Sequence, residues 1–109
     1  MHQSLPAVVV AEVPADAFVL DVREDEEWHA GHVDGAVHIP MSGLLARIDE
    51  VPQDQRVYVM CRVGGRSAQV TQYLASRGWD AVNIDGGMLA WDAAGRPMVS
   101  EHAGPAFVA

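Results

Sequence analysis

Short apolar runs alternate with short amphipathic segments along the whole chain. The apolar runs are rich in β-branched residues and end at proline, glycine or charged residues, which is typical of strands. One of them, Val57–Met60, is apolar at every position and therefore predicts a central strand that is covered on both faces. The predicted strands are Ala7–Ala11, Phe18–Leu20, Ala36–Ile39, Val57–Met60 and Ala81–Ile84.

The amphipathic segments between these runs predict short helices. Met41–Ile48 places Leu44, Leu45 and Ile48 on one face, with Ser42 as a candidate cap. The other predicted helices are Glu24–His29, Ser67–Arg77, which Gly78 ends, and Met88–Ala94.

The alternation of strands and helices predicts an α/β fold with a mainly parallel central sheet of about five strands and helices on both faces. We expect one domain over residues 1–98. Residues 99–109 have no periodicity and predict a loosely ordered tail. Ligands of such folds bind beyond the carboxyl ends of the strands. The sequence CRVGGRS stands at that position, directly after Val57–Met60.

Charge and cysteine content narrow the function further. The 109 residues carry 15 acids against 7 bases, a net charge of −8, which disfavours nucleic acid and anionic membranes as partners. The start of the chain lacks the basic region of a signal peptide, and no apolar run is long enough for a membrane span. A single cysteine, Cys61, excludes an internal disulfide and a multi-thiolate zinc site, so we expect a reducing, cytoplasmic location.

The segment Cys61–Ser67 has the composition of an anion-binding loop. Its glycine pair allows the backbone to curl and to point successive N–H groups inward, and the start of the following helix adds a partial positive charge. Arg62 and Arg66 add two permanent cations. Such surroundings lower the pKa of a thiol. A lone cysteine at the end of a strand is commonly only a small buried side chain, but this loop favours a nucleophile.

Three motifs resemble those of the rhodanese (sulfurtransferase) family. The loop CRVGGRS is similar to that family's active-site loop, C-R-x-G-x-R-S. Residues 21–40 resemble its first signature, with Val33 in place of the usual isoleucine and His38 where asparagine is common. Residues 85–91 resemble its G-G-x-x-x-W ending. The motifs occur in the family's order and the match covers about residues 5–97.

This resemblance implies a thiosulfate sulfurtransferase that carries sulfur as a persulfide on Cys61. It implies a small anionic donor such as thiosulfate, a thiol, cyanide or sulfur-relay protein as acceptor, and no metal or organic cofactor. Arg62 is expected to meet the donor, and Arg66 to brace the loop against Asp21 or Glu27. Asp21 is interpreted as structural support, while Arg23 either contacts substrate or pairs with the acidic run after it. The predicted substrate-binding residues are Arg62, Val63, Gly64, Gly65, Arg66 and Ser67.

Several alternatives stay open at this point. A persulfide carrier in a protein sulfur relay is one of them. A regulatory binding module without turnover is another, although loss of the cysteine would mark such a module and Cys61 is present. A phosphatase or arsenate reductase is disfavoured, because the related phosphatases place five residues between cysteine and arginine, whereas four separate Cys61 from Arg66. His29 and His32 do not form a metal pair, since Gly31 interrupts the helix between them. Gly86 and Gly87 are interpreted as a tight turn, with a second anion site as the alternative.

Overall fold

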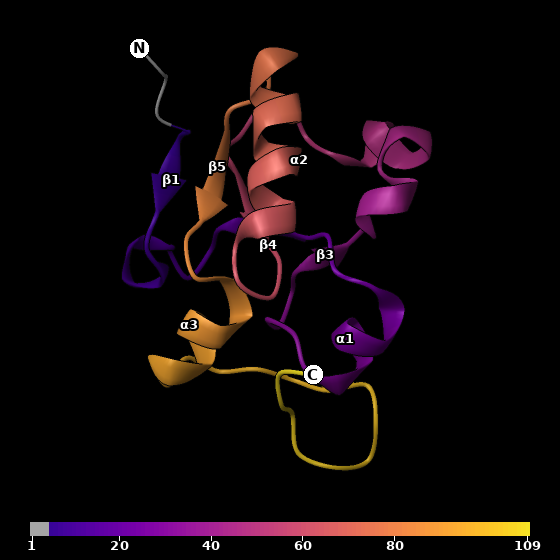
Figure 1. Cartoon of the computed structure of the whole chain (residues 1–109), viewed down its shortest axis with the longest axis vertical. Coiled ribbons are helices and arrows are strands. Elements are labelled where there is room, and N and C mark those ends of the chain that lie inside the picture. Colours follow the sequence, from indigo (N-terminus) through magenta and orange to yellow (C-terminus); the bar gives the residue numbers. More distant parts are fainter. Residues whose placement is uncertain (1–4) are drawn as a thin grey trace.

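The protein, described here by a computed structural model that covers residues 5–109, is built on a five-stranded sheet in which every neighbouring pair is parallel (Figure 1). The strand order is β1-β5-β4-β2-β3, so β4 is central, as its uninterrupted apolar sequence predicts. The strands are β1 (Ala7–Val8), β2 (Phe18–Asp21), β3 (Val37–His38), β4 (Val57–Met60) and β5 (Ala81–Ile84).

Three α-helices connect and cover the strands. They are α1 (Asp25–Ala30), α2 (Gly65–Ser76) and α3 (Gly87–Ala93). The described residues also form three 3-10 segments, η1 (Val10–Glu12), η2 (Met41–Gly43) and η3 (Leu45–Glu50). Among the described residues, no helix combines the length and the apolar character that crossing a membrane requires.

The core consists of two layers, one on each face of the sheet. Alternate residues of a strand point to opposite faces. Val59 therefore packs under Leu74 of α2, whereas Met60 packs with Met88 and Trp91 of α3. Burial of each large apolar side chain contributes about 1.5–3 kcal/mol. The predicted α/β fold with helices on both faces is confirmed.

Two predicted strands are longer than the observed ones. Val8 pairs with Ile84, the last residue of β5, so the chain beyond Val8 has no partner on that strand and turns into η1. Similarly, β3 contains only Val37–His38, because Ala36 donates its N–H to Val33 in a turn.

The predicted helix Met41–Ile48 is wrong. The segment forms two 3-10 turns that begin after Pro40, so Ser42 is not the cap, and Arg47 interrupts the second turn with non-helical dihedral angles. A 3-10 helix advances about 120° per residue instead of about 100°, which rotates the predicted apolar face. Consequently Leu44 is buried while Leu45 is 68% exposed.

Helix α2 begins at Gly65, two residues earlier than predicted. Gly64 precedes it with a φ of +112°, a conformation that favours glycine. The loop between β4 and α2 therefore contains only residues 61–64, and Arg66 and Ser67 belong to the first turn of the helix.

The segment 99–109 contains no helix or strand, yet it makes defined contacts with α1 and the loop after it. Val99 and His32 exchange two backbone hydrogen bonds of 2.8 and 2.9 Å, and Phe107 N–H donates to Ala30. A side chain on Gly31 would overlap the backbone of Phe107. Figure 1 shows this segment along the same end of the molecule as α1 and α3.

Candidate active site

The candidate nucleophile lies at the carboxyl end of the central strand. Cys61 directly follows β4, and its side chain points to the α2 face, like that of Val59 two residues earlier. The residue is 1% exposed. The strand thus delivers the thiol to the space under the first turn of α2.

Hydrogen-bond donors surround the Cys61 sulfur. Gly64 N–H donates to Sγ over 3.1 Å, and the Ser67 hydroxyl lies 3.2 Å from Sγ. Burial raises the pKa of the thiol, but the Ser67 hydroxyl and the backbone N–H groups of Ser67, Gly64 and Val63 outweigh it. The net result is a Cys61 pKa below its ordinary value, which increases the thiolate fraction.

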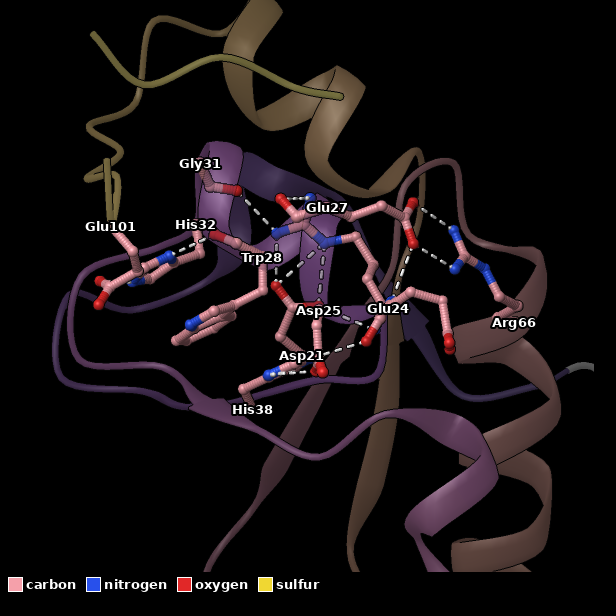
Figure 2. A network of polar contacts seen from close by, with 11 residues as sticks. Asp21, Glu24, Asp25, Glu27, Trp28, Gly31, His32, His38, Arg66 and Glu101 are labelled. Carbon is pink, nitrogen blue, oxygen red and sulfur yellow. Dashed lines mark hydrogen bonds and ion pairs between the residues drawn. The ribbon is translucent and has the colours of Figure 1, made fainter. Parts of the chain in front are cut away.

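Arg66 makes a bidentate pair with Glu27 of α1 (Figure 2). Its two Nη atoms lie 2.7 and 2.9 Å from the carboxylate oxygens. The brace predicted for Arg66 is confirmed with Glu27 and is absent with Asp21, whose carboxylate is occupied by Arg23. The pair fixes the first turn of α2, and with it Ser67, against α1.

Arg62 is partly exposed and contacts the last residue of the chain. Its Nε donates to the main-chain oxygen of Ala109 over 2.9 Å. The expectation that the two arginines are the main groups that lower the pKa of the thiol is corrected: the Ser67 hydroxyl and the backbone N–H groups are the main causes, and the charges of Arg66 and the Cys61 thiolate attract each other in addition. The adjacent Val63, within the same loop, is 55% exposed.

Asp21 and Arg23 form a buried ion pair. Arg23 Nη2 donates to Asp21 Oδ2 over 2.8 Å, and neither residue has exposed surface. The same guanidinium donates to the main-chain oxygens of Glu27 and Gly31. Arg23 thus pairs with Asp21 and not with the acidic side chains after it, and its guanidinium is enclosed by protein.

A second contact with the loop was not predicted from the sequence. Two free N–H groups in the first turn of α3, those of Met88 and Leu89, donate to the main-chain oxygens of Cys61 and Arg62 over 2.9 and 3.1 Å. A side chain on Gly87 would overlap these oxygens, and its φ is +55°. The only signal in the sequence is the glycine pair, which proves to be a tight turn against the loop.

Two histidines stack on Trp28, close to the polar contacts of Asp21, Arg23 and Glu27. The rings of His32 and His38 stack on the indole with centroid distances of 3.5 and 4.7 Å (Figure 2). His32 Nδ1 donates to the Trp28 main-chain oxygen, which ties this residue, just after the end of α1, back to that helix and not to its own loop. Among residues 5–109, no group of three or more potential metal ligands comes together.

Replacing Glu27 with glutamine is expected to lower stability at neutral pH and progressively less as the pH falls below 4.5. The Arg66 hydrogen bonds hold the pKa of Glu27 at about 2 against an ordinary 4.5. The stability from this carboxylate is complete above pH 4.5 and is lost as the pH falls toward 2. Urea unfolding should give a loss of about 1–3 kcal/mol at pH 7 and about half of that loss at pH 3, one pH unit above the pKa of the folded state.

Glu50→Gln is the matched control for this variant. Glu50 also pairs with an arginine, Arg47, but on the solvent-exposed surface. Its replacement should change the unfolding midpoint far less, because water and salt screen exposed pairs. An equal effect of the two variants at pH 7 would contradict the bracing role of Glu27.

Comparison with known proteins gives consistent matches. A family model described as "Rhodanese-like domain" matches residues 7–94. YtwF of Bacillus subtilis is 37% identical over 86 residues, which cover 79% of this chain and 84% of that protein. A protein of Allochromatium vinosum named "Sulfurtransferase" is 36% identical over 86 residues, which cover 78% of this chain and 80% of that protein. The crystal structure of a rhodanese-related protein from Thermoplasma volcanium superimposes with a TM-score of 0.82 at 30% identity, over 86% of this chain and 97% of that one.

Proposed function

Because this chain belongs to the rhodanese-like domain family, we propose that it transfers a sulfane sulfur from an anionic donor such as thiosulfate to a thiophilic acceptor through a persulfide on Cys61. The observation that supports this most is the shell of donors around the sulfur. Gly64 N–H and the Ser67 hydroxyl contact Sγ, and the pKa of the thiol is lowered by hydrogen bonds.

The proposed reaction has two half-reactions. The Cys61 thiolate attacks the outer sulfur of thiosulfate, the bond between the two thiosulfate sulfurs breaks, and sulfite leaves with the electron pair. Cys61 then carries the outer sulfur as an anionic persulfide. Cyanide or a thiolate attacks that outer sulfur, takes it as thiocyanate or a new persulfide, and the Cys61 thiolate leaves with its electrons. This is covalent catalysis with ping-pong kinetics.

The loop supplies electrostatic stabilisation in both steps. Charge moves from the sulfur of Cys61 to the transferred sulfur and back, and preorganised N–H groups stabilise such charge at little reorganisation cost. Two sets of contacts keep these donors in position. The α3 N-terminus holds the main-chain oxygens of Cys61 and Arg62, and the Glu27–Arg66 pair holds the first turn of α2.

Intact-mass measurement after thiosulfate treatment tests the proposal. The protein should gain one sulfur atom, and cyanide should remove it with release of thiocyanate. No gain in mass under conditions where Cys61 is reduced would overturn the reaction class. A sulfur that a protein thiol removes but cyanide does not would favour the persulfide carrier.

Replacing Arg62 with alanine is expected to weaken donor binding. Arg62 is partly exposed, and the one hydrogen bond of its side chain within residues 5–109 runs from Nε to Ala109, which leaves its other donors for an anion. The KM for thiosulfate should rise about 5- to 20-fold with little change in kcat, since a charge-assisted contact contributes about 1–2 kcal/mol. An unchanged KM would remove the proposed donor role of Arg62.

A further inference from the structure

The geometry points to Asn83 of β5 as a positioning residue for the sulfur-binding loop, a role that rests on the proposed function and adds a residue to it. Asn83 is paired in register with Val59 of β4. Paired residues of a parallel sheet point to the same face, so Asn83 lies on the α2 face beside Val59, two residues before Cys61. The residue is 4% exposed and reaches the loop from below.

The Asn83 amide has two acceptors on one side. Its Nδ2 lies 3.4 Å from the Gly64 main-chain oxygen and 3.1 Å from Asp85 Oδ1. The opposite orientation of the amide would place Oδ1 against both oxygens, so these neighbours fix which atom is nitrogen. Nδ2 thereby links the end of β5 to the residue that opens α2.

The Gly64 main-chain oxygen accepts two hydrogen bonds that together hold the end of the loop. It also accepts the Ala68 N–H over 3.1 Å, the first hydrogen bond of α2. Gly64 is in a left-handed conformation, and its own N–H donates to the Cys61 sulfur. The Asn83 amide and the Ala68 N–H together fix the peptide that follows Gly64, which limits rotation of the residue that presents an N–H to the sulfur.

Asn83 is retained in the core although part of it is unsatisfied. Its Oδ1 is buried and has no hydrogen-bond partner among residues 5–109, which disfavours the folded state. Thr71 Oγ1, on the buried face of the adjacent α2, is in the same situation, but Thr71 makes no hydrogen bond to the loop. An apolar side chain would suit a purely structural position between α2 and β5 better than asparagine does.

The test compares Asn83→Leu with the unmodified protein in two measurements. Iodoacetamide alkylation against pH should give a Cys61 midpoint higher by about half a pKa unit, equivalent to about threefold less thiolate below the midpoint. Urea unfolding should show equal or greater stability, because the unsatisfied amide is removed. After loading with thiosulfate, Asn83→Leu should also lose its persulfide sulfur faster than the loaded unmodified protein does.

Thr71→Val is the matched control, since it removes the other unsatisfied group of the same interface without touching the loop. It should leave the alkylation midpoint unchanged. Asn83→Ala, which adds no atoms, is measured beside Asn83→Leu in case the larger side chain prevents folding. A folded Asn83 variant whose Cys61 alkylation midpoint equals that of the unmodified protein would overturn the inference. Because alkylation needs no sulfur donor, that outcome is distinct from failure of the unmodified protein to form a persulfide.

Discussion

Replacing Cys61 with serine is expected to abolish sulfur transfer. The hydroxyl is not ionised at neutral pH and cannot hold the transferred sulfur as a persulfide, so both half-reactions are lost. Turnover with thiosulfate and cyanide should fall by about 1,000-fold or more. In the mass measurement, the variant should gain no sulfur under conditions in which the unmodified protein gains one.

The fold should survive this change. Cys61 is buried, but the serine hydroxyl is smaller than the thiol and would meet the same Gly64 N–H and Ser67 hydroxyl. The free energy of unfolding should therefore change by about 1 kcal/mol or less. A loss of activity with the urea midpoint nearly unchanged separates the chemical role of the sulfur from its packing.

Ser67→Ala is the matched control for the sulfur itself. It keeps the nucleophile and removes only the hydroxyl that lies 3.2 Å from it. The variant should retain measurable turnover, with the alkylation midpoint of Cys61 shifted upward, because one of the groups that lower the pKa is lost. Turnover by Cys61→Ser equal to that of Ser67→Ala would contradict the proposed mechanism.

The sequence predicted those parts of the fold that depend on local pattern. The apolar run Val57–Met60 identified the central strand, and the spacing of Val70 and Leu74 identified α2. The pattern was misleading over Met41–Ile48, because apolar spacing does not distinguish an α-helix from 3-10 turns. Strand ends such as Val8 depend on where the partner strand stops, which is a non-local property.

For the candidate site, the sequence identified the loop but not the partners of its side chains. Glu27 was one of two candidates for Arg66, and only the approach of α1 to α2 selects it. The contacts of Arg62, Gly87 and Asn83 join segments that are 19 to 47 residues apart in the sequence and that meet only after folding. No periodicity encodes such pairs, so they could not be inferred.

Replacing Asp21 with asparagine is expected to produce the largest loss of stability among these variants. The Asp21 carboxylate accepts from the Arg23 backbone N–H, Nε and Nη2 over 2.8–3.1 Å, and both residues are fully buried. Asparagine keeps the shape but leaves the guanidinium buried without a counter-charge. Breaking such a pair costs about 3–5 kcal/mol, which urea unfolding at pH 7 would measure.

The double variant Asp21→Leu/Arg23→Met distinguishes loss of the charge pair from loss of packing. If the single variant is unstable because a charge is left unpaired, removal of both charges should recover much of the stability. A loss below about 1 kcal/mol for Asp21→Asn would show that water or another acceptor compensates the guanidinium, contrary to its enclosed geometry.

The same variant should also slow sulfur transfer, although Asp21 does not touch the thiol. Arg23 donates to the main-chain oxygens of Glu27 and Gly31, so the pair with Asp21 fixes both the middle and the end of α1. The side chain of Glu27 in turn holds Arg66 in the first turn of α2, next to Ser67. Freeing the guanidinium loosens α1, and the loss reaches the sulfur through this chain of contacts. At a temperature where Asp21→Asn is still folded, the alkylation midpoint of Cys61 in this variant should therefore move toward that of an ordinary thiol.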